Sequence, residues 1–183
     1  MVWAEGKEIQ SGKYVIDSVI GRGGFGITYK ALNIPLKQYV VIKTPYEYRK
    51  NNADYPQYVK RFTREARILA RLSKAPHPHI VEVNDFFFEG DVPCLVMSHI
   101  PGSNLWDMVR KGQRLPESRA VEYIQQVGSA LSFLHNSGLI HRDVYPKNIM
   151  MRSNHKAILI DFGIAGEIVP LMMSSALFGN QSF

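Results

Sequence analysis

Cysteine is nearly absent from this 183-residue chain, in which Cys94 stands alone. A single thiol cannot close an internal disulfide, and this favours a reducing compartment and predicts a cytoplasmic protein. The chain also has no apolar run long enough to span a bilayer, and residues 1–10 lack the charged-then-apolar pattern of a secretory signal. We therefore expect no membrane segment in this chain.

Internal repeats and low-complexity tracts are missing as well. Hydrophobic residues make up 45% of the chain, which is enough for one core or two small lobes. The net charge of +6 is compatible with nucleotides, acidic proteins or anionic surfaces as partners, and equally with a solvated basic surface. No aromatic stacking platform accompanies the basic residues, so no nucleic-acid partner is expected.

Strands and turns dominate the first hundred residues. Alternating and β-branched patterns predict strands over 14–20, 27–32, 39–44, 80–88 and 93–97. Between the third and fourth of these, residues 58–72 are predicted as a helix, with Phe62, Ala66 and Leu69 on one face. Four cations follow another face of this helix, and we interpret them as solvated or as a dock for an acidic or phosphorylated partner: Lys60, Arg64, Arg67 and Arg71.

Helical patterns follow a linker at Pro101-Gly102. Residues 104–109 are predicted as a short helix and residues 116–136 as a longer one. Four apolar positions spaced three or four apart define the predicted buried face of the longer helix: Ile124, Val127, Leu131 and Leu134. Short strands are predicted over 148–152 and 157–160.

A glycine cluster, Gly21-Arg22-Gly23-Gly24-Phe25-Gly26, lies between the first two predicted strands. Glycines in such a hairpin let the backbone approach phosphate groups without side-chain obstruction. An ordinary glycine-rich turn has the same pattern. A dinucleotide-binding site would need a helix directly after the glycines, and residues 27–32 are strand-like instead.

Lys43 ends a strand of buried type, Val40-Val41-Ile42-Lys43. Its ammonium group would either reach solvent at the end of its aliphatic stem or bind phosphate while a carboxylate steadies it. Glu65 is the candidate carboxylate, because it lies on or beside the buried face of the predicted helix. The alternative for Glu65 is a surface pair with Arg61.

The run His141-Arg142-Asp143-Val144-Tyr145-Pro146-Lys147-Asn148 is followed by Asp161-Phe162-Gly163. With the glycine cluster and Lys43 upstream, these motifs resemble the signature set of eukaryotic-type protein kinases, in the same order. The resemblance runs from about Tyr14 to Phe183, and it is to the bacterial serine/threonine kinases of this type.

This resemblance implies an α+β, two-lobe fold. A five-stranded antiparallel lobe with one main helix would be followed by an incomplete helical lobe. The implied limits are an N-terminal extension over 1–13, a nucleotide-binding lobe over 14–98 and a partial second lobe over 99–183.

The resemblance also implies roles for the motif residues. Asp143 would accept the proton of the acceptor hydroxyl, and Lys43, steadied by Glu65, would hold the α- and β-phosphates of ATP. Asn148 and Asp161 would hold Mg²⁺ through oxygen ligands.

Further positions would surround the nucleotide. Five residues of the hairpin would cover the phosphates: Gly21, Gly23, Gly24, Phe25 and Gly26. Six residues would enclose or face the adenine ring: Thr28, Val41, Met97, Ser98, Ile100 and Met150.

Two departures from the family pattern bear on activity. Tyr145 stands where serine/threonine kinases usually carry a lysine that meets the γ-phosphate. Lys147 would supply the missing charge, as an arginine at that position does in some tyrosine kinases. Pro146 fits the serine/threonine pattern.

The second departure is that the family's A-P-E motif has not appeared by Phe183. We expect a kinase domain that stops within its activation segment, as a fragment or a truncated product. Phosphate on Ser174 or Ser175 of that segment would pair with Arg142.

These observations predict a protein serine/threonine kinase that transfers the γ-phosphate of Mg-ATP to an unidentified protein. Tyr145 keeps open an alternative, an ATP-binding interaction module without transfer activity. A small-molecule phosphotransferase is less favoured, because Arg142 follows His141 as in protein kinases.

Overall fold

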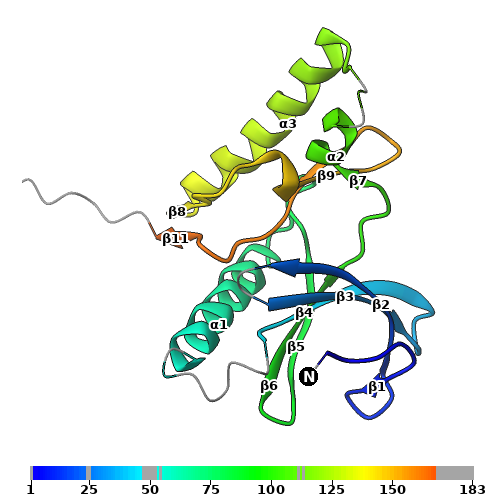
Figure 1. The fold of residues 1–183 in the computed structure, drawn as a ribbon. Coiled ribbons are helices and arrows are strands. Elements are labelled where there is room, and N and C mark those ends of the chain that lie inside the picture. The colour runs from blue at the N-terminus through cyan, green and yellow to red at the C-terminus, as the bar shows by residue number, and fades with distance from the viewer. Residues whose placement is uncertain are drawn as a thin grey trace, which may run out of the picture.

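The first part of the chain folds into an antiparallel sheet with one helix, and the second part is built around helices (Figure 1). The computed structural model describes residues 2–23, 26–46, 53, 55–110, 112 and 114–167. We call residues up to Ser98 the first lobe, residues from Pro101 onward the second lobe, and 98–100 the hinge. The predicted order of a strand-rich lobe and then a helical lobe is confirmed.

Six strands form the sheet of the first lobe, in the order β1-β2-β3-β4-β6-β5. Their bounds are Glu8–Ile9, Tyr14–Gly23, Gly26–Asn33, Gln38–Thr44, Val83–Glu89 and Val92–Ser98 for β1 to β6. Every neighbouring pair in this sheet is antiparallel. The strand predicted over 80–88 begins later than expected, because Ile80 instead bridges Leu159 of the second lobe.

The sixth strand, β1, lies in the segment that the sequence predicted as an extension outside the lobe. Ile9 is 1% exposed, and the Trp3 ring stacks on Tyr29 of β3 with 5.2 Å between centroids. The five-strand count was therefore short by one. A two-residue strand is too short to carry the alternation that identifies strands in a sequence.

Both faces of the sheet are covered, and this explains why β6 is buried almost throughout. Because successive side chains point to opposite faces, Cys94 and Val96 join one apolar cluster while Leu95 and Met97 join another. Lys43 pairs with Leu95 across β4 and β6, so it shares the face of Leu95. Burial raises the pKa of the Cys94 thiol to about 12, so this cysteine is a core residue rather than a nucleophile.

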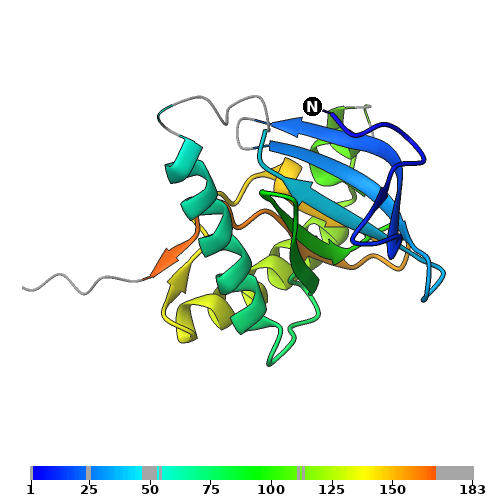
Figure 2. The ribbon, with the colours of Figure 1, turned by 90° about the horizontal axis from the view of Figure 1, so that it is seen from below.

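Helix α1 (Tyr55–Leu72) packs on the Leu95 face of this sheet (Figure 2). Phe62, Ala66 and Leu69 are buried, as the spacing predicted. The helix begins three residues before the predicted start, because Pro56 is tolerated in a first turn, where its missing N–H would have no partner.

Two helices and several short strands make up the second lobe. The two helices are α2 (Leu105–Arg110) and α3 (Glu117–Asn136), and a 3₁₀ turn, η2, covers Pro146–Asn148. Strands β10 (Ala157–Leu159), β9 (Ile149–Met151) and β7 (Ser103–Asn104) form one small sheet, and β11 (Gly166–Glu167) pairs with β8 (Leu139–Ile140). No helix in these described ranges is both long and apolar enough to cross a bilayer.

The buried face of α3 differs in part from the predicted one. Val127 and Leu134 are buried as expected, but Ile124 is 71% exposed and Tyr123 is buried in its place. Polar contacts set this rotation, because Gln126 accepts a 2.7 Å hydrogen bond from Ala157 N and donates one to His155 O. Apolar spacing alone carries no information about such contacts.

Candidate active site

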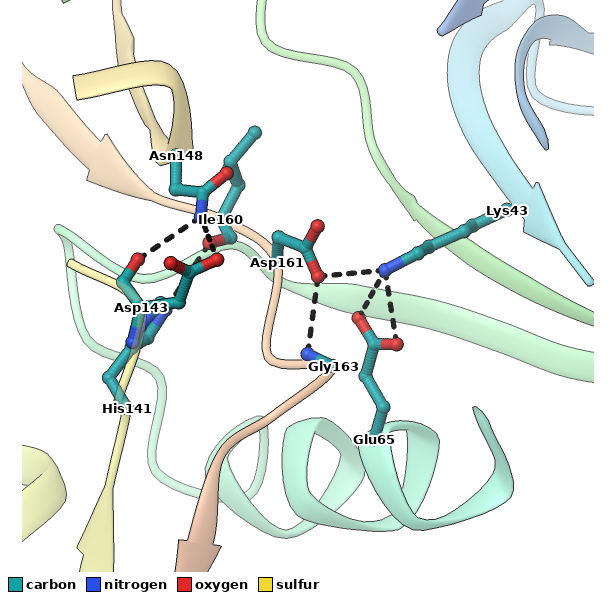
Figure 3. Close-up of polar contacts among 8 residues, drawn as sticks. All are labelled: Lys43, Glu65, His141, Asp143, Asn148, Ile160, Asp161 and Gly163. Atoms are coloured by element: carbon teal, nitrogen blue, oxygen red, sulfur yellow. Dashed lines mark hydrogen bonds and ion pairs between the residues drawn. The ribbon is translucent and has the colours of Figure 1, made fainter. Parts of the chain in front are cut away.

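Three charged residues from distant parts of the chain, Lys43, Glu65 and Asp161, form one cluster (Figure 3). The Lys43 ammonium donates hydrogen bonds to Glu65 Oε1 at 2.8 Å and Oε2 at 3.1 Å, and to Asp161 Oδ1 at 2.8 Å. Lys43 comes from β4, Glu65 from α1, and Asp161 follows β10. Lys43 and Glu65 are 7% and 3% exposed, so neither the solvent-reaching Lys43 nor the surface pair of Glu65 with Arg61 is observed.

The charges of this cluster fix its protonation. Burial by itself lowers the pKa of Lys43, but the facing carboxylates of Glu65 and Asp161 outweigh that cost and leave the pKa raised. Burial likewise pushes the pKa of Asp161 upward, and the Lys43 ammonium more than offsets it, so this pKa is lowered. At neutral pH the cluster therefore holds a protonated lysine beside an ionised Asp161.

The segment after Asp161 turns sharply beneath α1. Asp161 has φ 60°, and its Oδ1 also accepts a 3.2 Å hydrogen bond from Gly163 N. Phe162 is 1% exposed and belongs to the same apolar cluster as the buried face of α1. A Cβ at Gly163 would lie 3.2 Å from Asp161 Oδ1 and 3.6 Å from Glu65 Oε2, so a side chain there would crowd the charged cluster.

His141 is buried beside the catalytic candidate Asp143, and both of its ring nitrogens contact backbone atoms. It is 1% exposed, its Nε2 lies 3.3 Å from Ile160 O, and its Nδ1 accepts a 3.2 Å hydrogen bond from Asp143 N. Burial lowers the pKa of His141, which keeps the ring neutral with its proton on Nε2. The ring also meets Phe162 edge-on, with centroids 4.6 Å apart. His141 thus joins the backbone before Asp161 to the backbone of Asp143.

Asp143 and Asn148 lie beside this support (Figure 3). Asn148 Nδ2 donates to Asp143 Oδ2 at 2.8 Å and to Asp143 O at 3.1 Å. The Asp143 side chain is exposed, so its carboxylate is accessible to a molecule from outside the protein. The amide nitrogen of Asn148 is used by Asp143, which leaves its carbonyl oxygen to act as a ligand.

The residues around Tyr145 form an aromatic cluster that the sequence did not predict. The Tyr145 ring lies against Trp106 of α2 with 5.6 Å between centroids, and the Lys147 ammonium lies 5.5 Å from the Trp106 centroid. Cation–π attraction therefore holds Lys147 on the Trp106 ring, next to the loop that carries Asp143. Trp106 lies far from Lys147 in the sequence, and no spacing rule relates the two.

The glycine cluster forms the hairpin between β2 and β3, as predicted. Gly21 pairs with Thr28, and Gly23 pairs with Gly26, while Gly24 and Phe25 lie outside the described residues. A Cβ at Gly26 would come within 1.9 Å of Thr44 O, so packing requires this glycine. A Cβ at Gly23 would meet nothing within 4 Å, so packing does not explain that glycine.

The predicted adenine-facing residues collect around the hinge. Val41 pairs with Met97, and the buried Met97 and Ile100 share an apolar cluster against which Val41 and Met150 pack. Thr28 pairs with Lys43 on β3 and β4. Ser98 is held by the segment 82–84: its N–H donates a hydrogen bond to Glu82 O at 3.0 Å, and its hydroxyl donates one to Asn84 Oδ1 at 3.2 Å.

The oxygen donors of Asp161 and Asn148 suit a hard cation such as Mg²⁺. Among the described residues, no group of three or more histidine, cysteine, aspartate or glutamate side chains is arranged to hold a metal. Mg²⁺ commonly takes one or two carboxylates and completes its octahedron with substrate phosphates and water. The donor set therefore fits an ion that arrives with a nucleotide.

Ser174 and Ser175, the predicted phosphorylation sites, lie outside the described residues.

Comparison with known proteins gives consistent results. The family profile described as "Protein kinase domain" matches residues 14–182. A probable serine/threonine-protein kinase of Clostridium acetobutylicum is 32% identical over 158 residues, covering 86% of this chain and 23% of its own length. A probable serine/threonine-protein kinase of Streptomyces coelicolor is 35% identical over 180 residues, with coverages of 94% and 26%.

Two further proteins extend the comparison. Serine/threonine-protein kinase PknB of Mycobacterium leprae is 35% identical over 180 residues, with coverages of 94% and 28%. The chain thus spans about a quarter of the length of these curated relatives. The solved structure titled "PpkA-294 apo form" is similar in fold, with a TM-score of 0.78 at 24% identity over 88% of this chain and 62% of that one.

Proposed function

Because this chain belongs to the protein kinase domain family, we propose that it carries the nucleotide-binding and catalytic elements of a bacterial serine/threonine kinase. The proposed reaction transfers the γ-phosphate of ATP to a hydroxyl of a protein substrate. One observation carries the proposal: the Lys43 ammonium bridges Glu65 and Asp161, and Asp161 and Asp143 are linked through the backbone contacts of His141.

Each residue has a separate part in this reaction. Lys43, held by Glu65, donates hydrogen bonds to the α- and β-phosphates, and the glycine hairpin covers them with backbone N–H groups. Gly23 fits this role because a Cβ there would meet no atom within 4 Å, so packing does not require a glycine, while close approach of the backbone to phosphate would. Ile100 N–H and C=O have no hydrogen-bond partner among the described residues, which leaves both for the adenine edge.

The acceptor hydroxyl is the nucleophile. Asp143 orients this hydroxyl and accepts its proton while the hydroxyl oxygen forms a bond to the γ-phosphorus of ATP. The bond between the γ-phosphorus and the oxygen that bridges it to the β-phosphate breaks, and ADP is released. Asn148 and Asp161 would hold Mg²⁺, which neutralises charge on the phosphates when it is bound. Lys147 would add a further cation beside the transferred group. We also propose a cytoplasmic location, where Cys94 stays reduced.

Replacing Asp161 with alanine is expected to weaken Mg²⁺-dependent ATP binding about 10- to 100-fold, the amount that loss of one charge-assisted contact represents. The fold should survive, because Lys43 keeps Glu65 as a partner at 2.8 Å. Titration calorimetry with ATP, with and without Mg²⁺, measures the effect. Glu117→Ala, at an exposed carboxylate on α3, is the matched control. Unchanged Mg-ATP affinity in the Asp161 variant would refute the metal assignment.

Replacing Lys147 with methionine is expected to lower kcat about 10²- to 10³-fold, with the KM for ATP nearly unchanged, if its ammonium stabilises the transferring phosphoryl group. Lys147→Arg should retain most of the rate, since it keeps the charge on the Trp106 ring. Lys7→Met, at an exposed lysine, controls for the loss of one positive charge.

The same series distinguishes the alternatives to a protein kinase. If Lys147→Met leaves kcat unchanged, Lys147 does not replace the missing lysine at position 145. If the wild-type chain binds Mg-ATP and transfers no phosphate, the ATP-binding interaction module is the better description. Turnover on small alcohols but not on proteins would indicate a small-molecule phosphotransferase.

A further inference from the structure

Trp106, Val109 and Tyr145 form a surface, here called the apolar patch, next to the loop that carries Asp143. Trp106 and Val109 are three residues apart on α2, so they lie one turn apart on neighbouring parts of its surface. The Tyr145 ring lies against the Trp106 ring, with 5.6 Å between centroids and 34° between planes. Helix α2 lies beside β7 and β9 (Figure 1) and contacts η2, which begins directly after Tyr145. The apolar patch is therefore shared by α2 and the catalytic loop.

The side chains of the apolar patch keep much of their surface in water. Trp106 is 37% exposed, Tyr145 is 42% exposed and Val109 is 54% exposed. Packing within the chain therefore does not explain why two large rings are held together here. Tryptophan and tyrosine are the residue types that most often anchor a bound protein segment, because each offers a large apolar area with few rotatable bonds.

The apolar patch lies within reach of a segment that meets Asp143. Tyr145 follows Asp143 by two residues, so their Cα atoms are at most about 7 Å apart. The Asp143 carboxylate is exposed, and Asn148 Nδ2 donates to its Oδ2 at 2.8 Å. Each residue of an extended segment advances about 3.3 Å. A side chain within about three positions of the acceptor hydroxyl would consequently reach the patch.

The charges around the apolar patch disfavour a basic side chain there. Helix α2 and the run 141–148 together carry three cations, Arg110, Arg142 and Lys147. No described carboxylate lies within ion-pair distance of these cations. The one carboxylate of α2, Asp107, accepts a 2.9 Å hydrogen bond from Asn104 Nδ2. The surroundings therefore favour an uncharged apolar side chain over lysine or arginine.

We propose that the apolar patch binds a large apolar side chain of the protein substrate, within about three residues of the hydroxyl that receives phosphate. The inference rests on the proposed kinase function and adds to it a preference among acceptor sites. An aromatic or long aliphatic side chain would cover the exposed parts of the Trp106 and Tyr145 rings and remove apolar area from water. The acceptor hydroxyl would then lie at Asp143.

Nuclear magnetic resonance titration of the 183-residue chain with short synthetic peptides tests the proposal. Each peptide carries one serine in an alanine–glycine background, with phenylalanine, alanine or arginine at one position within three residues of the serine. The expected result is a saturable shift of the Trp106 indole N–H signal. The best phenylalanine peptide should bind about 5- to 10-fold more tightly than the matching alanine peptide. The signal of Trp3, which is 9% exposed in the first lobe, should not move and serves as an internal reference.

Variants test whether the patch itself causes the preference. Trp106→Ala and Tyr145→Ala should each remove most of the difference between phenylalanine and alanine peptides, while Trp106→Phe should keep most of it. Fluorescence anisotropy of a labelled peptide measures binding without a tryptophan signal. Leu36→Ala, at a side chain 64% exposed between β3 and β4, is the matched control and should bind as wild type does.

Several outcomes would overturn the proposal. It fails if no phenylalanine peptide shifts the Trp106 signal, or if the arginine peptides bind as tightly as the phenylalanine peptides. It also fails if Trp106→Ala and Tyr145→Ala, with melting temperatures like that of the wild type, keep the full preference.

A transfer assay on the same peptides separates this inference from the proposed function. A chain that binds phenylalanine peptides through Trp106 and transfers no phosphate would refute the kinase reaction and support the apolar patch as a peptide site. A chain that phosphorylates phenylalanine, alanine and arginine peptides with equal kcat/KM would support the reaction and overturn the proposed preference.

Discussion

Replacing Asp143 with asparagine is expected to lower the rate of phosphate transfer by about 10²- to 10⁴-fold, the contribution typical of one general base. The substitution conserves shape and removes only the charge and the ability to accept a proton. Asn148 Nδ2 donates to Asp143 Oδ2 at 2.8 Å, and an amide oxygen at position 143 accepts the same bond. Transfer of labelled γ-phosphate to the chain itself or to a mixed protein substrate measures the rate.

The binding of Mg-ATP separates this effect from misfolding. Asp143→Asn should bind the nucleotide as wild type does, because the Lys43 contacts to Glu65 and Asp161 are untouched. Its melting temperature should also match the wild-type value within the error of the measurement. A variant that keeps the full rate of transfer would exclude Asp143 as the base, and the acceptor proton would then have to leave by another route.

Replacing Lys43 with methionine is expected to lower the free energy of unfolding by about 3–5 kcal/mol, besides abolishing most phosphate transfer. Removing one partner of a buried ion pair leaves the other charge without compensation, and this costs more than the pair itself contributes. Glu65 is only 3% exposed and would keep its carboxylate in the core with no cation beside it. Chemical denaturation at pH 7 measures the loss.

The pH dependence of this variant follows from the sign of the Glu65 shift. Burial raises the pKa of Glu65, and without Lys43 that effect is unopposed by a cation. Between the unfolded and the folded pKa, the folded state binds a proton that the unfolded state has released, so stability falls as pH rises through this interval. In the wild type, the lowered pKa of Asp161 gives stability that is lost in acid. The stability gap between the two proteins should therefore narrow as pH falls.

The double variant Lys43→Met/Glu65→Leu is the control for buried charge. With both partners apolar, most of the lost stability should return, since an apolar pair is often as stable as a buried ion pair. Phosphate transfer should stay low in the double variant, because the phosphate-binding ammonium is still missing. If the double variant is as unstable as the single one, the loss does not come from the uncompensated Glu65 carboxylate but from packing or from Asp161, which also loses its contact with Lys43.

The sequence predicted those parts of the site that lie in motifs of fixed spacing. Lys43 was placed on a buried strand and Glu65 on a helix face, and both positions follow from local periodicity. Their meeting with Asp161 depends on a contact between residues 118 positions apart, and the sequence did not predict that contact. The Lys147–Trp106 contact was missed because neither periodicity nor a family motif relates those two positions.

The errors in the predicted fold have a similar origin, since they also depend on contacts between distant residues. The rotation of α3 that exposes Ile124 is set by the hydrogen bonds that Gln126 donates to His155 O and accepts from Ala157 N, and apolar spacing in the sequence does not reveal these bonds. Strand β1 was missed because Trp3 and Ile9 are anchored by aromatic and aliphatic side chains of strands that come later in the chain. Local sequence patterns identified most helices and strands. Tertiary contacts determined which face of a helix is buried and which short strand extends the sheet.

One apolar cluster runs without interruption from α1 and β6 of the first lobe to α3 and β10 of the second. Leu69 and Leu95 belong to it, and so do Leu134 and Leu159. The lobes are therefore not two independently stable modules joined by a tether. Cutting the chain at the hinge to express either lobe alone would expose a large apolar surface on both pieces. Each piece would then tend to reassociate with the other or to aggregate.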